Sequence, residues 1–217
     1  MTRSRRNTDL TTVLLVAILL LNSTTLTFLL SGWEHLPESF LCALCCYWTL
    51  RKKPTHLNAL CFGLFCACAV LMRIDAALLV GPIAVGYLLS AKRTTAPVVG
   101  IVTAVTLIGI YAVFQWHWFH QFLPTTARLK ANYLVPPSYQ AKYFLRAIAS
   151  GTAAGFVPAI LVTHYRRLMR SSMLVKAAVG GVASEYVYAY MVSDVFSGAR
   201  MYLAPLAVSL VAVAVAR

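Results

Sequence analysis

Apolar runs separated by short polar segments dominate this sequence from residue 11 to residue 216. The chain of 217 residues is 60% hydrophobic and only 12% charged, whereas soluble domains average about 25% charged residues. In a bilayer the backbone must satisfy its own hydrogen bonds, which favours helices, and a span takes about 20 apolar residues. We therefore expect an all-α chain, a single polytopic transmembrane bundle over residues 1–217.

About eight helices are expected in this bundle. We assign them to residues 11–30, 37–50, 56–73, 74–90, 95–115, 146–163, 172–192 and 201–216. Residues 1–10 then form a basic leader, and residues 116–145, with many aromatic and basic side chains, form the one long outer loop. The run after Arg5 and Arg6 lacks a small-residue cleavage site, so we interpret it as a span and not as a cleavable signal.

The basic residues predict which side of the membrane each connection faces, because cytoplasmic loops carry an excess of Lys and Arg. Twelve of the 19 basic residues fall on alternate connections: Arg3, Arg5, Arg6, Arg51, Lys52, Lys53, Lys92, Arg93, Arg166, Arg167, Arg170 and Arg217. We predict that these connections and both chain ends are cytoplasmic, in a multi-pass protein of the plasma (inner) membrane. The net charge of +13 is then a topology signal, and no nucleic-acid partner is expected.

Most of the acidic residues fall on the opposite, outer side. Glu34, Glu38, Asp75 and Asp194 lie at the outer ends of apolar segments, and Glu185 lies within one. Carboxylates near hydrocarbon are costly and are therefore candidates for function. Glu38 follows a proline at the start of a segment, as a helix-start residue would, and Glu185 has no evident partner.

All six cysteines lie in apolar runs: Cys42, Cys45, Cys46, Cys61, Cys66 and Cys68. The first three are spaced as in some metal sites, but no second cysteine pair or histidine adjoins them. We expect buried, reduced thiols and no metal site.

Polar residues gather in four outer segments, at 31–38, 71–79, 122–130 and 190–205. Arg73 and Asp75 have two interpretations: an ion pair that closes a helical hairpin, or part of a site. Arg128 and Lys130 lie on the less basic side, where phosphate or lipid headgroups attract such cations.

Four motifs occur in series within these segments. They are Ser31-Gly32-Trp33-Glu34-His35, then Arg73-Ile74-Asp75-Ala76-Ala77-Leu78-Leu79, then Leu123-Pro124-Thr125-Thr126-Ala127-Arg128-Leu129-Lys130, and finally Ser193-Asp194-Val195-Phe196 with Arg200 and Leu203-Ala204-Pro205. In this order they resemble segments of the GT-C superfamily of polyprenyl-phosphate-dependent membrane glycosyltransferases, above all its bacterial arabinosyl- and mannosyltransferase-like members. The family's counterparts are Ser-Gly-Leu-Glu-Thr, Thr-Arg-Pro-Asp-Ala/Gly-Leu-Leu, Leu-Pro-Asn-Thr-Ala-x-x-Lys, and Gly-Gly-Asp-Phe-Met-x-x-Arg before Leu-Leu-Pro-Ala.

The resemblance implies a membrane enzyme whose outward-facing site transfers a sugar from a polyprenyl-phosphate donor to a glycan or lipid acceptor. The catalytic carboxylates that it implies are Glu34, Asp75 and Asp194. The donor-binding cations that it implies are Arg73, Arg128, Lys130 and Arg200. The sequence specifies no cofactor.

One departure from the family pattern is that the large first outer loop, which normally carries the catalytic acid, is missing. Glu34 would then be the base, a partner chain would supply the missing loop, or the chain would be inactive. The alternatives are a non-catalytic membrane scaffold subunit of a split glycosyltransferase and, because of Glu185, a small transporter.

Overall fold

The computed structural model describes residues 35–90, 94–122, 137–149, 153–192 and 202–216, and every regular element in these ranges is a helix. The helices are α3 (His35–Arg51), α4 (His56–Met72), α5 (Ala76–Ser90), α6 (Ala96–Phe119), α8 (Pro137–Ala149), α9 (Ala153–Thr163), α10 (Tyr165–Arg170), α11 (Met173–Val192) and α12 (Leu203–Val215). The all-α prediction is confirmed for this part of the chain. The expected helix at 11–30 lies outside the described residues.

Six expected segments match the helices α3, α4, α5, α6, α11 and α12, but the segment expected at 146–163 is not one helix. It is divided between the end of α8 and the whole of α9, and α8 also fills part of the expected 116–145 loop. A Cβ atom added at Gly155 would lie 2.4 Å from the carbonyl oxygen of Ile148. Glycine at this position thus allows α9 to pack against the end of α8, where we expected a continuous span.

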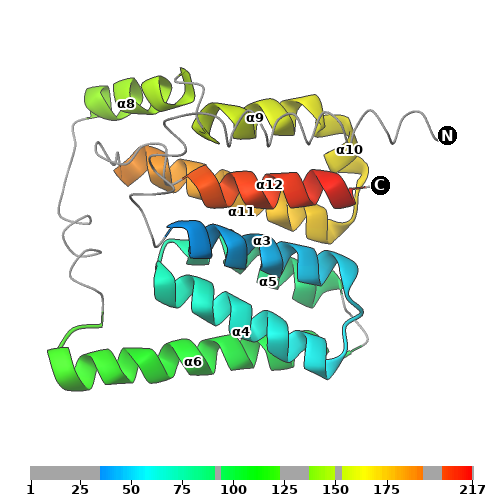
Figure 1. Cartoon of the computed structure of the whole chain (residues 1–217), viewed down its shortest axis with the longest axis vertical. Coiled ribbons are helices and arrows are strands. Elements are labelled where there is room, and N and C mark those ends of the chain that lie inside the picture. The colour runs from blue at the N-terminus through cyan, green and yellow to red at the C-terminus, as the bar shows by residue number, and fades with distance from the viewer. Residues whose placement is uncertain (1–34, 91–93, 123–136, 150–152, 193–201, 217) are drawn as a thin grey trace.

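The long helices lie side by side and alternate in direction, which gives the bundle two opposite ends (Figure 1). The Arg73 end, named after the residue between α4 and α5, holds the starts of α3, α5 and α12 and the ends of α4, α6 and α11. The opposite end is called the Arg51 end, after the last residue of α3. There the Nε of Arg167 donates to the carbonyl oxygen of Ala216 at 2.6 Å, which ties α10 to the end of α12.

Most of the charged residues named below are divided between these two ends as predicted from the basic residues on alternate connections. The connection between α3 and α4 and the short helix α10 are at the Arg51 end (Figure 1). Together they carry Arg51, Lys52, Lys53, Arg166, Arg167 and Arg170. The acidic residues Glu38, in the first turn of α3, and Asp75, just before α5, lie at the Arg73 end.

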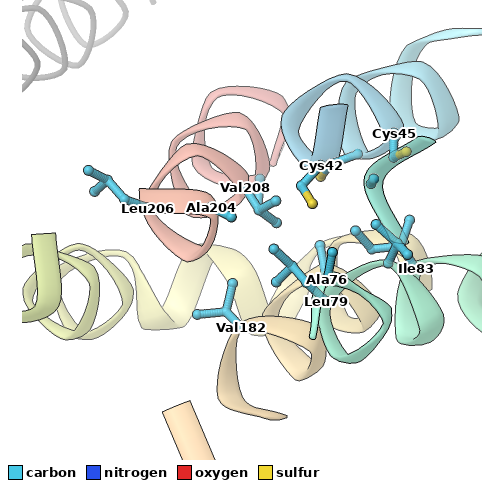
Figure 2. Close-up of a cluster of buried hydrophobic side chains, with 14 of the residues drawn as sticks. Cys42, Cys45, Ala76, Leu79, Ile83, Val182, Ala204, Leu206 and Val208 are labelled. Atoms are coloured by element: carbon cyan, nitrogen blue, oxygen red, sulfur yellow. The ribbon is translucent and has the colours of Figure 1, made fainter. Parts of the chain in front are cut away.

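The core lies where α3, α5, α11 and α12 meet. Figure 2 shows Cys42 and Cys45 beside Leu79, Val182 and Val208, all of them buried. All six cysteines are free thiols; four of them are buried, as expected, whereas Cys61 and Cys68 are only partly buried.

The helix α6 lies at the edge of the bundle and packs mainly on α4 (Figure 1). Among the described helices it alone is both long enough, with 24 residues, and apolar enough to cross a membrane. Its contact with α4 depends on two glycines. A Cβ atom at Gly63 would lie 2.2 Å from the carbonyl oxygen of Gly100, and one at Gly100 would lie 2.6 Å from the carbonyl oxygen of Ala59.

We predict that Gly63→Ala destabilises the purified chain by about 1–3 kcal/mol, because the added methyl group forces α4 and α6 apart. Gly109→Ala is the matched control, since a Cβ atom there would meet nothing within 4 Å and alanine is the better helix former. Thermal unfolding followed by circular dichroism measures both. Equal unfolding midpoints for the two variants would contradict the close approach of α4 and α6.

Candidate functional site

The turn between α4 and α5 holds Arg73 and Asp75 at the tip of a helical hairpin. The helix α4 stops at Met72, and Arg73 follows it in an extended conformation, with φ −149° and ψ 125°. The N–H of Ala76 then donates to the carbonyl oxygen of Arg73 at 3.1 Å, so α5 begins within the same turn. The tight hairpin expected here is therefore formed.

Arg73 and Asp75 form a two-point ion pair. The Nε of Arg73 donates to Oδ1 of Asp75 at 3.0 Å, and Nη2 donates to Oδ2. The two side chains are only 9% and 7% exposed. The fork of the guanidinium group matches a carboxylate in this geometry, and a buried ion pair needs such complete pairing to offset its desolvation.

The start of α3 brings two more polar side chains to this pair. Oε2 of Glu38 lies 3.3 Å from Nε of Arg73 and 3.5 Å from Nδ1 of His35. Nη1 of Arg73 lies 2.9 Å from both ring nitrogens of His35. His35 and Glu38 are both buried. We call His35, Glu38, Arg73 and Asp75 the Arg73 cluster.

Two members of the Arg73 cluster are not predicted by sequence reasoning. Glu38 is expected only as a helix-start residue, and it does lie in the first turn of α3. No role is predicted for His35. The signal in the sequence is their spacing of three residues at a helix start, which places both on one face. Only the fold brings that face to Arg73.

Glu185 reaches the Arg73 cluster from α11. It is 3% exposed, and its Oε2 atom has no hydrogen-bond partner among the described residues. It lies close enough to interact electrostatically with Asp75, Glu38 and Arg73. The acid for which the sequence offers no partner therefore lies near this cluster, without a hydrogen bond or ion pair to it among the described residues.

Arg73, which is predicted to be a donor-binding cation, lies within the Arg73 cluster. Its Nε, Nη1 and Nη2 atoms each contact a side chain of the cluster. These contacts use part of the hydrogen-bonding capacity of the guanidinium group, whose side chain is largely buried. In this arrangement the guanidinium group neutralises and orients Asp75 and Glu38.

The other predicted site residues lie outside the described residues: Glu34, Arg128, Lys130, Asp194 and Arg200. The described neighbours of three of them are at the Arg73 end. Glu34 directly precedes His35, and the segment with Asp194 and Arg200 joins the end of α11 to the start of α12. There the rings of Tyr186 and Tyr202 have centroids 4.7 Å apart.

A cavity of about 570 Å³ lies away from this cluster, at the Arg51 end. Its lining comes from the end of α3, the start of α11 and the end of α12, and includes Arg51, Ser171 and Ser172. Among the described residues no three His, Cys, Asp or Glu side chains are placed to hold a metal ion. Among the described residues, the Arg73 end offers carboxylates and an imidazole held around one guanidinium group.

We predict that Arg73→Met destabilises the chain by about 3–5 kcal/mol, because it leaves buried carboxylates without their cation. Arg170→Met, at an exposed position of α10, should change stability by at most about 0.5 kcal/mol. Chemical unfolding of the purified proteins measures the difference. Similar unfolding midpoints for the two variants would show that Arg73 does not hold the cluster together.

We further predict opposite effects for two acids of the site. Glu185→Leu should leave the stability unchanged or raise it, since a buried carboxyl oxygen without a hydrogen bond is a cost. Glu38→Leu should lower it by about 1–3 kcal/mol, because it removes an acceptor from Arg73. The same unfolding measurement applies. A loss of stability in Glu185→Leu as large as that in Glu38→Leu would mean that Glu185 has a stabilising partner beyond the described ranges.

Comparison of the chain with models of known protein families, with curated proteins and with solved structures found no match.

Proposed function

We propose that the chain is a multi-pass protein of the plasma (inner) membrane, with its Arg73 end outward. The long apolar helix α6 supports this, because side chains such as Val102 and Ile110 are 56% and 62% exposed on it, which suits lipid better than water. Trp116 and Trp118 near its end are typical of an aromatic belt. The basic connections at the Arg51 end fit the cytoplasmic side.

We infer that the protein is a membrane glycosyltransferase of the GT-C type, or a truncated or degenerate relative. It would transfer a sugar from a polyprenyl-phosphate donor to a glycan or lipid acceptor at the outer face. The observation that carries this inference is the contact of His35 with Arg73, 38 residues apart. The two residues belong to the first two of the four family-like motifs, and motifs that build one site must meet in space.

The proposed reaction is an inverting transfer. The acceptor hydroxyl oxygen bonds to the anomeric carbon while a carboxylate takes the hydroxyl proton. The bond from that carbon to the donor phosphate breaks, and the polyprenyl phosphate leaves with the electron pair. We propose Glu34 as the base, and Arg128, Lys130 and Arg200 as the cations that stabilise the departing phosphate.

The remaining predicted residues would act on the sugar and on the geometry of the site. Asp75 and Asp194 are proposed to accept hydrogen bonds from sugar hydroxyls or to orient the cations. Arg73 is proposed as a positioning residue, because its three nitrogens contact the Arg73 cluster and not open space. Its contribution to transfer would come through Asp75 and Glu38.

A second candidate is a non-catalytic scaffold subunit of a split glycosyltransferase. It is favoured by the contacts of Arg73 with Glu38 and His35, which join α3 to the hairpin of α4 and α5. In this case a partner chain would supply the missing first loop and its acid. The retained motifs would then stabilise the fold and the contact with that partner.

For the enzyme we predict that Lys130→Ala lowers kcat about 10²–10³-fold, since it removes one charge-stabilising donor from the leaving phosphate. Asp194→Asn should abolish transfer. The assay uses the full chain in lipid vesicles with polyprenyl-phosphate-linked arabinose or mannose and measures labelled product. Arg166→Ala, at an exposed position of α10, is the control and should retain wild-type activity.

Two results would contradict this assignment in different ways. Unchanged transfer in Lys130→Ala and Asp194→Asn would exclude these residues from the site of an active enzyme. Binding of the donor without any transfer by the wild-type chain, restored by a partner chain, would identify the scaffold.

A further inference from the structure

The helix α8 is amphipathic, and one of its faces packs on the bundle at the Arg73 end (Figure 1). Nε2 of Gln140 donates to the carbonyl oxygen of Met191 at 3.2 Å. The ring of Phe144 meets those of Tyr186 and Tyr190 edge-on, with centroids 6.3 Å and 5.3 Å apart. Gln140 and Phe144 are four residues apart and so share the face that docks on α11.

The opposite face of α8 carries two cations that are exposed. Lys142 and Arg146 are exposed, and Tyr139 and Leu145 beside them are 52% and 63% exposed. Side chains four residues apart are neighbours on a helix surface, where like charges repel. No ion pair with a carboxylate relieves this repulsion within the described part of the chain. An anion bound between the two cations would relieve it.

The composition of this face fits a phospholipid headgroup. The cations match the phosphate group, while Leu145 and the stems of Lys142 and Arg146 match the apolar atoms below it. The face also lies at the same end of the bundle as the last turns of α6, where Trp116, Trp118 and Phe119 are exposed. Aromatic residues of this kind mark the headgroup level of a bilayer.

We propose that the face of α8 opposite to the one that docks on α11 binds the anionic headgroups of phospholipids in the outer leaflet through Lys142 and Arg146. This inference rests on the proposed membrane location but not on the glycosyltransferase activity. It assigns the basic pair a role separate from binding the donor. The bound lipid would hold α8, and with it the end of α11, at a defined depth.

Photo-crosslinking of the full chain in vesicles tests this proposal. A photoreactive phenylalanine analogue replaces Leu145, and the vesicles contain equal parts of phosphatidylglycerol and phosphatidylcholine. Mass spectrometry then identifies the crosslinked lipid. A second probe at Val102, on the exposed middle of α6, reports whether the bundle lies in the bilayer at all.

We expect the Leu145 probe to capture phosphatidylglycerol in preference to phosphatidylcholine at low salt. Lys142→Gln combined with Arg146→Gln should weaken this preference by about five-fold for each charge removed, and added salt should weaken it in the wild-type chain. The matched control is Arg166→Gln combined with Arg170→Gln, the exposed pair at the same spacing in α10. It should leave the preference at Leu145 unchanged.

Equal capture of the two lipids, or a preference that survives loss of Lys142 and Arg146, would overturn the proposal. Crosslinks from Leu145 to another part of the chain or to a second copy would overturn it too, because the face would then be covered by protein. If the probe at Val102 still captures lipid in these cases, the membrane location stands. If neither probe captures lipid, both the location and this inference fail.

Discussion

Three helices, α3, α4 and α5, meet around the guanidinium group of Arg73, and the polar part of the structure depends on this one cation. Taking a carboxylate out of water costs several kcal/mol unless it is paired and hydrogen-bonded. Here Asp75 and Glu38 pair with Arg73, and Glu185 lies near enough to interact with it electrostatically. The planar fork of arginine can serve two carboxylates and a histidine at once, which the single ammonium group of a lysine could not do.

The helices could largely be predicted from the sequence, because most of them are apolar runs that end at charged or turn-forming residues. The break between α8 and α9 could not be predicted from hydropathy, and the close approach of Gly155 to the backbone of Ile148 is seen only in the fold. The pairing of Arg73 with Asp75 is local and is visible as a two-residue spacing. The contacts of Arg73 with His35 and Glu38, and the approach of Glu185, join residues far apart in sequence, so only the packing of α3, α5 and α11 reveals them.

The charges at the two ends of the bundle differ in their exposure to solvent and in their pairing. At the Arg51 end the cations are mostly exposed, as Arg51, Arg166 and Arg170 are, and water or lipid phosphate can solvate them. In the Arg73 cluster, at the other end, the charges are buried and arranged against one another. Substituting a surface charge has little effect on stability. In the Arg73 cluster, by contrast, the neighbours of each charge offset the free-energy cost of its burial.

In the proposed membrane topology, the hairpin of α4 and α5 also bears on how the chain would enter the bilayer during synthesis. Its tip holds Arg73 and Asp75 two residues apart and paired at two points. Carried separately through the centre of a bilayer, an arginine and an aspartate would each cost about 2.5–3.5 kcal/mol on insertion scales. As a pair they cross with no net charge, so in the proposed topology the hairpin can be translocated as one unit.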